Sequence, residues 1–333
     1  MNILVTGAAG FIGSALCKQL VKSGENVTAV DNFSDYYHTS LKHLRVVELL
    51  NPFNLKVLTL DICDKPSIDK LIKSTKPDVI INLAAQAGIR LSASESGKYV
   101  DSNLVGFSNI LISTIENKVP NFLYASSSSV YGDLAKIPYS EVENNLRPNS
   151  FYGSTKLANE LLTPTLIKNS ATKARGLRFF TVYGPWGRPD MAYFRMIANV
   201  ISGTEFNFFG DGSIERDFTF IDDAIDSVIS LMFEMDAYHP GFSDVVNLGG
   251  GRPLSMNYLL EVVNSITHKQ VSFNRLESNQ NDARKTMSDT AYIKKLIGSK
   301  PSTKLEDGIS MTIDWASSKE ISSNLDKWVK SVK

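Results

Sequence analysis

The sequence predicts an α/β fold with a Rossmann-type, doubly wound parallel sheet and a smaller α/β lobe. Through the first half of the chain, short apolar runs alternate with segments of helical length, as in parallel sheets covered by helices. A glycine-rich turn follows the first run directly, and the alternation stops near residue 181. With 333 residues, the chain is long for one hydrophobic core, so a second lobe is expected.

The expected strands are near-continuously apolar, which is typical of strands buried on both faces. They span residues 2–6, 26–30, 55–60, 78–84, 121–126, 174–180 and 244–249, and the expected helices span 12–23, 66–75, 99–117 and 152–169. The stretches 183–192 and 208–218 are rich in Gly, Pro and charge and are expected to be loops. The sheet domain should comprise residues 1–180 plus about 219–250, and the second lobe about 181–218 plus 251–333.

The composition limits the classes of partner and site. Thirty-five basic and thirty-five acidic residues cancel, which argues against a nucleic-acid partner. Cys17 and Cys63 are too few for a disulfide framework or a four-ligand zinc site. His38 is one of only four scattered histidines, so no metal site is expected. The start MNILVTG does not resemble a signal peptide, and no apolar run approaches the ~18–20 residues that span a bilayer. We therefore expect a cytoplasmic protein with no membrane partner.

The turn after the first strand predicts a dinucleotide site. Gly7, Gly10 and Gly13 lie between a strand and the start of a helix, where backbone N–H groups and the helix dipole face a pyrophosphate. Asp31 ends the second strand, eighteen residues after Gly13, where a carboxylate accepts bonds from both ribose hydroxyls. A 2′-phosphate would meet that negative charge, so NAD is favoured over NADP. A glycine turn with an unrelated surface Asp remains the alternative.

Other strand ends extend the expected cofactor site. Asp61 closes the third strand and could reach the adenine amino group, and small residues in LAAQAG (83–88) leave space for the cofactor at the sheet edge. The remaining expected cofactor-binding residues are Phe11, Ile12, Asn32, Ile62, Leu83, Ala84, Ala85, Gln86 and Asn103.

Two features after the fifth strand predict catalysis. Tyr152 and Lys156 are spaced i and i+4, so they are neighbours on one helical face. A phenol titrates near ~10, and an ammonium beside it together with the positive nicotinamide favours the phenolate and brings its pKa towards the ~7 useful for proton transfer. The run ASSSSVYGD (125–133) has the composition of a flexible linker, but it directly follows a buried strand.

Together these motifs make the chain resemble the extended short-chain dehydrogenase/reductases that act on nucleotide sugars. More narrowly, DNFSDYYHTSLK, AAQAGIR, YVDSNLVGFSNIL, ASSSSVYG and LRFFTVYGPWGRPDMA resemble bacterial UDP-glucuronate 4-epimerases, and the likeness covers nearly the whole chain. The resemblance implies tightly held NAD that is recycled within each turnover. It also implies a homodimer through a four-helix interface, formed here by residues 99–117 and 151–169. A helix buried within one chain shows the same apolar stripe.

The resemblance also assigns catalytic roles. Tyr152 would take the proton from the sugar O4 while C4 is oxidised, and the 4-keto sugar would turn over and be reduced on its other face. Lys156 would bond the nicotinamide ribose, and Ser127 would relay the O4 proton. Ser126 would support the strand end. Ser128 and Ser129 would line the sugar pocket, and because they are not the Asp–Glu pair of related dehydratases, dehydration is disfavoured.

Residues beyond 180 bear on the choice of sugar. Thr181 resembles the uronate-specific epimerases, and Arg188 is a candidate partner for a sugar carboxylate, or else a surface arginine. Arg216 matches the position that holds the nucleotide diphosphate in the family. The other expected substrate-binding residues are Gly88, Arg90, Phe209 and Asp282. Arg90 alternatively only structures its loop, and Phe209 packs either against the uracil or in the core. Asp282 lies in NDARKTMSD, which resembles the family's GDVPATYAD but departs from it at Asn281 and Arg284.

The sequence therefore favours 4-epimerisation of a UDP-sugar, most strongly UDP-glucuronate to UDP-galacturonate. The alternatives are a 4-epimerase of UDP-N-acetylglucosamine, of its uronate or of UDP-glucose. A dehydratase or decarboxylase, a dehydrogenase with net oxidation or reduction, and a non-catalytic NAD-binding sensor remain further alternatives.

Overall fold

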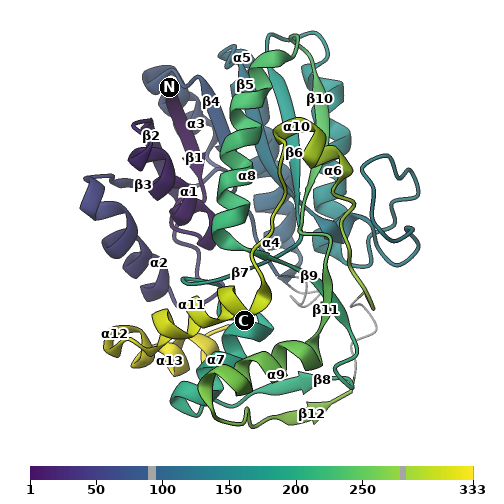
Figure 1. Cartoon of the computed structure of the whole chain (residues 1–333). Coiled ribbons are helices and arrows are strands. Elements are labelled where there is room, and N and C mark those ends of the chain that lie inside the picture. The colour runs from purple at the N-terminus through teal and green to yellow at the C-terminus, as the bar shows by residue number, and fades with distance from the viewer. Residues whose placement is uncertain (89–94, 278–282, 333) are drawn as a thin grey trace.

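A seven-stranded parallel sheet forms the body of the computed structural model, which describes residues 1–88, 95–277 and 283–332 (Figure 1). The strand order is β10-β6-β5-β4-β1-β2-β3, so the order of the chain reverses between β1 and β4. The bounds are β1 Asn2–Thr6, β2 Asn26–Asp31, β3 Val57–Thr59, β4 Val79–Asn82, β5 Asn121–Ser127, β6 Lys173–Phe179 and β10 Ser243–Leu248. The doubly wound sheet predicted from the sequence is confirmed, and open sheets of this kind bind ligands where the order reverses.

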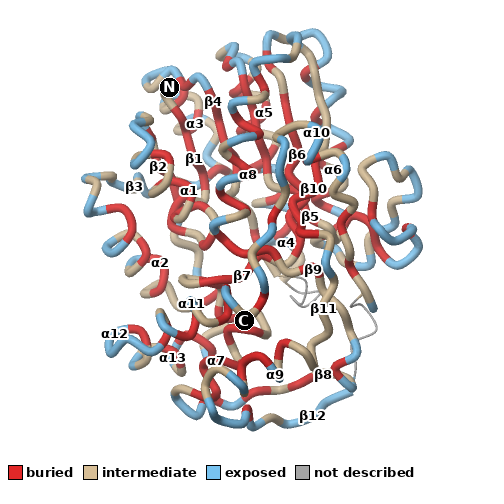
Figure 2. Tube along the Cα trace, viewed as in Figure 1, coloured by how far each residue is buried: buried red, intermediate tan, exposed pale blue. Residues whose placement is uncertain are grey.

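Side chains that alternate along each strand contribute to two hydrophobic cores, one on each face of the sheet. In β1, Ile3 and Val5 pack into the core on one face, while Leu4 packs into the core on the other. In β4, Ile80 likewise joins Leu4, opposite its neighbours. Because successive side chains of a strand point to opposite faces, both faces need apolar cover, which explains the continuous apolar runs (Figure 2).

Helices cover both faces of the sheet. Helices α1 and α8 pack together on one face, and α3, α5 and α6 lie on the other. The helix bounds are α1 Phe11–Lys22, α2 Ser40–Arg45, α3 Lys65–Thr75, α4 Gly97–Tyr99, α5 Phe107–Glu116, α6 Phe151–Ile167, α7 Ala192–Ser202, α8 Ile221–Glu234, α9 Met256–Thr267, α10 Ala291–Ile297, α11 Leu305–Ser317, α12 Lys319–Ser322 and α13 Leu325–Lys330. Within the described residues, none of these is both long and apolar enough to cross a membrane.

The helix expected at residues 99–117 is not uniform. A π-helical segment, Val100–Gly106, joins α4 to α5. Gly106 closes this segment, and a Cβ there would lie 2.6 Å from the Ile62 side chain. The wider turn therefore brings the backbone against the end of the third strand, beside the predicted cofactor site.

A smaller group of elements lies at the foot of the sheet, with α7, α9 and α11–α13 around it (Figure 1). It contains a three-stranded sheet of β7 Thr181–Tyr183, β9 Glu215–Phe220 and β11 Pro253–Ser255, and a two-stranded sheet of β8 Asn207–Phe209 and β12 Asn274–Leu276. The loop expected at 208–218 is therefore wrong at both ends. The charge of Asp217 was one reason to expect a loop. In the structure its side chain is fully buried in β9 and accepts hydrogen bonds from the N–H groups of Gly250, Gly251 and Ser288, which lie far away in the sequence.

Candidate active site

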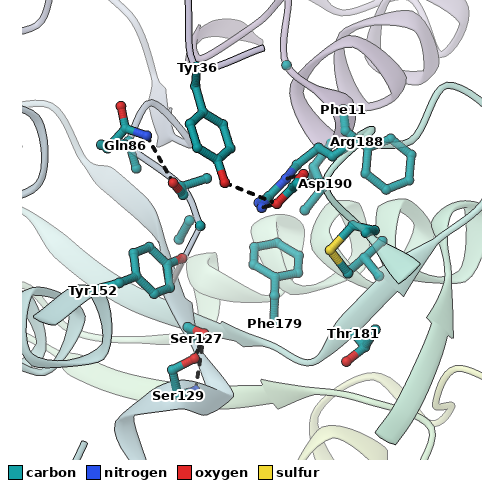
Figure 3. Close-up of a pocket in the computed structure, with 18 of the residues that line it drawn as sticks. Phe11, Tyr36, Gln86, Ser127, Ser129, Tyr152, Phe179, Thr181, Arg188 and Asp190 are labelled. Carbon is teal, nitrogen blue, oxygen red and sulfur yellow. Dashed lines mark hydrogen bonds and ion pairs between the residues drawn. The ribbon is translucent and has the colours of Figure 1, made fainter. Parts of the chain in front are cut away.

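A cavity of about 700 Å³ opens at the carboxyl ends of the parallel strands and extends to the smaller lobe (Figure 3). Its lining includes the glycine turn after β1, the ends of β2, β4 and β5, the start of α6 and the loop that carries Arg188. Segments far apart in the sequence therefore meet in a single pocket.

The glycine turn approaches the next strand closely. Gly7 has φ +72°, and a Cβ there would lie 2.8 Å from the backbone nitrogen of Ala84. A Cβ on Gly13 would lie 2.0 Å from the Gly7 oxygen. Helix α1 begins at Phe11, and its N-cap Gly10 makes no side-chain cap. The N-cap residue thus leaves the first-turn N–H groups at this end of the pocket without a side-chain cap, and the site fits the diphosphate of a dinucleotide.

Asp31 lies at the adenosine end of the predicted cofactor site. Its carboxylate accepts N–H groups from Ala9 at 3.0 Å and from Phe33 at 2.7 Å. Lys42, which the sequence analysis missed, places its Nζ 3.5 Å from Asp31 Oδ1. These contacts hold the carboxylate at the end of β2, beside the pocket.

Two expected cofactor residues, Asp61 and Asn103, are not among the residues that line the pocket. Asp61 accepts hydrogen bonds from Asn32 Nδ2 at 2.9 Å and from the Cys63 N–H at 2.8 Å. Burial opposes the charged form of Asp61, but these bonds outweigh it and lower its pKa. Asn103 is 1% exposed. Its Oδ1 accepts the Gln86 N–H at 2.8 Å, and its Nδ2 donates to the Gln86 carbonyl at 3.1 Å. Its amide therefore holds the loop after β4 in place.

The serine run forms a tight turn against the first turn of α6. Ser127 Oγ accepts the Ser129 N–H and donates to Ser129 Oγ, each at 3.1 Å. A Cβ on Gly153 would lie 2.7 Å from the Ser129 oxygen, so glycine at this position lets the turn and the helix touch. Ser126 instead donates to the buried Glu160. The run is thus an ordered wall of the pocket and not a linker.

Tyr152 and Lys156 share this wall. Lys156 is 3% exposed, donates to the Ala125 carbonyl at 2.9 Å and lies 5.7 Å from the Tyr152 ring centroid. Burial lowers the pKa of Lys156 to about 8, while the charge of Glu160 acts in the opposite direction. Burial raises the pKa of Tyr152, and the positive charge of Arg188 and the Ser127 hydroxyl offset part of that rise.

Arg188 lies across the pocket from the serine turn, and it is paired (Figure 3). Its Nε donates to Asp190 Oδ1 at 3.0 Å, and its Nη2 donates to Asp190 Oδ2. The Tyr36 hydroxyl donates to the same Oδ2 at 3.4 Å. Burial opposes ionisation of Asp190, but Arg188 outweighs it and lowers the pKa of Asp190. Asp190 and Tyr36 were both missed from the sequence, although Asp190 follows Arg188 by only two residues in a Gly/Pro turn.

Other predicted substrate residues lie at the far end of the pocket. Arg216, in β9, donates from Nη1 to the carbonyls of Ala283 at 2.7 Å and Glu215 at 2.9 Å. Phe209 ends β8 and lines the cavity. The predicted residues among the lining are Gly7, Gly10, Phe11, Ile12, Gly13, Asp31, Asn32, Ile62, Leu83, Ala84, Ala85, Gln86, Gly88, Ser127, Ser128, Ser129, Tyr152, Lys156, Thr181, Arg188, Phe209 and Arg216. Arg90 and Asp282 lie outside the described residues.

Known proteins share this architecture. Residues 3–249 match the model of the NAD dependent epimerase/dehydratase family. Protein CapI of Staphylococcus aureus is 36% identical, over 95% of this chain and 98% of its own length. A probable UDP-glucuronate 4-epimerase of Rhizobium meliloti is 34% identical, over 95% of this chain and 96% of its own length. A Bacillus cereus UDP-glucuronic acid 4-epimerase, solved with UDP-glucuronic acid and NAD, matches with a TM-score of 0.85 and 33% identity, over 95% of this chain and 98% of that one.

Proposed function

Because this chain belongs to the NAD dependent epimerase/dehydratase family, we propose that it is a UDP-sugar 4-epimerase that interconverts UDP-glucuronate and UDP-galacturonate. The observation that carries the proposal is that Tyr152, Lys156, Ser127 and Arg188 line one pocket, with Tyr152 and Ser127 across it from Arg188 (Figure 3). The first three residues suit oxidation and reduction at a carbinol carbon, and the fourth suits a sugar with a carboxylate. The names of similar proteins agree with this substrate.

The glycine turn, Asp31 and the end of β4 would hold NAD, which when bound supplies the acceptor and donor of a hydride. The close approach of Gly7 to Ala84 leaves no room for a side chain between the turn and β4. Lys156 would bond the nicotinamide ribose. Its lowered pKa, about 8, means that the buried ammonium gives up its proton more easily than an exposed lysine.

The acid–base work falls to the wall formed by the serine turn and α6. Tyr152 would accept the proton of the sugar O4, with Ser127 as the relay between them. Burial raises the pKa of Tyr152, and the charge of Arg188 and the Ser127 hydroxyl offset part of that rise. Ser128 and Ser129 offer hydroxyls and no carboxylate, so they bind the sugar without catalysing loss of water.

Thr181 and Arg188 would hold the carboxylate of the sugar. A 4-keto-hexuronic acid is a β-keto acid, which loses CO₂ when its carboxylate aligns with the carbonyl π system. Contacts with these two donors would hold the group away from that alignment before and after the keto sugar turns. Arg216 would contact the diphosphate and Phe209 the uracil. This arrangement separates a cofactor domain, residues 1–180 plus about 219–250, from a nucleotide-sugar domain.

We also propose that two copies pair through the helices at 97–116 and 151–167. Both carry exposed apolar side chains: Val100, Val105, Phe151, Leu161, Leu162 and Leu166. Leu161 is 66% exposed, which is costly for a helix that faces only water. A solution mass near twice the 36.8 kDa of the chain would support the dimer, and a mass equal to that of one chain would contradict it.

The test is incubation of the purified protein with UDP-glucuronate, UDP-glucose and UDP-N-acetylglucosamine, with the products resolved by NMR. We expect UDP-galacturonate from UDP-glucuronate without added NAD and without net formation of reduced nicotinamide. Tyr152→Phe should lower kcat at least about 10³-fold, because it removes the proton acceptor. Arg188→Ala should raise KM for UDP-glucuronate far more than the inhibition constant of UDP-glucose. Turnover of a neutral sugar alone would replace the proposed substrate.

A further inference from the structure

The guanidinium of Arg188 has two edges, and the described residues occupy only one of them. Asp190 takes the edge formed by Nε and Nη2. No hydrogen bond within the described part of the chain uses Nη1. The Arg188 side chain is 26% exposed and lines the pocket, whereas Asp190 is 13% exposed. An incoming carboxylate can therefore reach the Nη1 edge while Asp190 keeps the other.

Asp190 also changes the charge that a substrate meets. Its lowered pKa keeps it ionised, so Arg188 and Asp190 together carry no net charge. The positive charge of Arg195 also acts on Asp190. Without the Asp190 carboxylate, the sugar would face a bare guanidinium in a partly desolvated pocket, where charge-assisted hydrogen bonds are strongest. Asp190 thus weakens the attraction that Arg188 exerts on a second carboxylate.

The reaction gives a reason for a weakened attraction. Between oxidation and reduction the 4-keto sugar must turn over inside the pocket, so its carboxylate must leave its first position. A bidentate contact between the sugar and an unpaired arginine would stabilise the ground state and raise the barrier to this rotation. A site that turns its substrate requires a carboxylate contact that is specific in geometry and moderate in strength.

We propose that Asp190 is a positioning residue that moderates Arg188, so that a sugar carboxylate is bound through the Nη1 edge and released when the 4-keto sugar turns. This inference rests on the proposed function. It assigns two linked effects to Asp190: a weaker binding of the sugar carboxylate and a faster rotation of the 4-keto sugar.

Tyr36 adjusts the same contact in the opposite direction. Its hydroxyl donates to Asp190 Oδ2, the oxygen that also accepts Arg188 Nη2, so the two donors compete. Burial and the charge of Asp190 raise the pKa of Tyr36, so the phenol stays a neutral donor. Gly88 makes room for it, because a Cβ at this position would lie 2.2 Å from the Tyr36 oxygen. Loss of the hydroxyl should strengthen the hold of Asp190 on Arg188.

The experiment compares Asp190→Asn with Tyr36→Phe in steady-state kinetics on UDP-glucuronate. For Asp190→Asn we expect KM to fall about 5-fold and kcat to fall about 10-fold, because a stronger ground-state contact must be broken during rotation. For Tyr36→Phe we expect KM to rise about 2-fold, because Asp190 loses the competing hydrogen bond from Tyr36 and holds Arg188 more strongly. The inhibition constant of UDP-glucose, which has no carboxylate, should change less than about 2-fold in either variant.

A raised or unchanged KM in a folded Asp190→Asn variant would overturn the inference, as would an equal change in the UDP-glucose inhibition constant. Circular dichroism and retained NAD establish folding. If Asp190→Asn does not fold, the sign of the Tyr36→Phe effect decides, and a lowered KM contradicts the proposal. Absence of epimerisation by the unmodified protein refutes the proposed function instead, so the two failures are distinct.

Discussion

Two arginine–carboxylate pairs use the same bidentate geometry in different surroundings. Arg178 donates from Nε and Nη2 to Glu160 at 2.9 and 2.7 Å, and their side chains are 3% and 5% exposed. Arg188 donates from the same two nitrogens to Asp190, but those side chains are 26% and 13% exposed. The chemistry of the pairs is alike, so their different roles must come from what surrounds them.

The pair of Arg178 and Glu160, called the sealed pair below, has hydrogen-bond partners beyond its own two side chains. Arg178 Nη1 donates to the Tyr131 hydroxyl at 2.7 Å, which donates on to Asn247 Oδ1 at 2.8 Å, and Glu160 also accepts from Ser126. These contacts join β5, β6, β10 and α6 directly beneath the catalytic wall. The pair at Arg188 keeps an edge without a bond among the described residues. The contrast is that Arg178 has bonded partners on both edges, whereas the second edge of Arg188 lies at the pocket.

The largest effect on stability should follow from breaking the sealed pair. Glu160→Gln leaves the buried charge of Arg178 uncompensated and should lower the free energy of unfolding by about 3–5 kcal/mol. Asp190→Asn should cost about 1 kcal/mol, because water reaches Arg188. Urea unfolding measures both. Equal losses would mean that the two pairs do not differ as their burial indicates, and the double variant Glu160→Leu, Arg178→Met should recover much of the stability.

A smaller effect of opposite sign should follow at Lys156, whose ammonium is bonded to no carboxylate among the described residues. Burial lowers its pKa from 10.5 to about 8. Below pH 8 the folded protein carries a charge that burial disfavours, so Lys156→Met should raise stability at pH 7 by about 2–3 kcal/mol while abolishing most activity. Unfolding is measured with NAD removed.

The pH dependence supplies the check on this prediction. Between about pH 8 and 10.5 the unfolded chain keeps the Lys156 proton and the folded chain has lost it, so the stability of the unmodified protein rises with pH there. The advantage of Lys156→Met should therefore shrink as the pH rises from 8 to 9.5. An advantage that stays constant would show that the ammonium is not destabilised by burial.

Much of the pocket was predictable from the sequence, because many of its residues lie in patterns that can be recognised over a short stretch of the chain. The glycine turn, the strand-end serines and the Tyr152–Lys156 spacing follow from the periods of strands and helices and from the rule that parallel strands end at one edge. The pair of Arg188 with Asp190 was not predictable in this way. It depends on a loop that Arg45, fully buried, holds through the carbonyls of Trp186 at 2.9 Å and Gly187 at 2.9 Å. That contact spans more than 140 residues, and no local pattern encodes it.

The same limit explains Lys42. From the sequence, the segment that contains His38 and Lys42 resembles an ordinary surface loop. In the structure Lys42 lies in α2, and its Nζ lies 3.5 Å from Asp31 Oδ1 at the end of β2. The C-terminal helix helps to fix this position, because Trp328 Nε1 donates to Ser40 Oγ at 2.9 Å. Side chains that reach the site from such tertiary contacts are the ones that sequence periods miss.

Smaller changes in stability are expected for two adjacent serines, which should differ in their effect on kcat. Ser126 and Ser127 follow each other at the end of β5, so their side chains leave opposite faces of the strand. Ser126 donates to Glu160 in the sealed pair, so Ser126→Ala should cost about 1.5 kcal/mol of stability, the value of a hydrogen bond to a charged group, with kcat nearly unchanged. Ser127→Ala, the matched control, should cost less than about 1 kcal/mol but lower kcat about 10²-fold or more, because it removes the proton relay. A kcat loss of similar size in both variants would mean that the sealed pair contributes to catalysis and does not only support the wall above it.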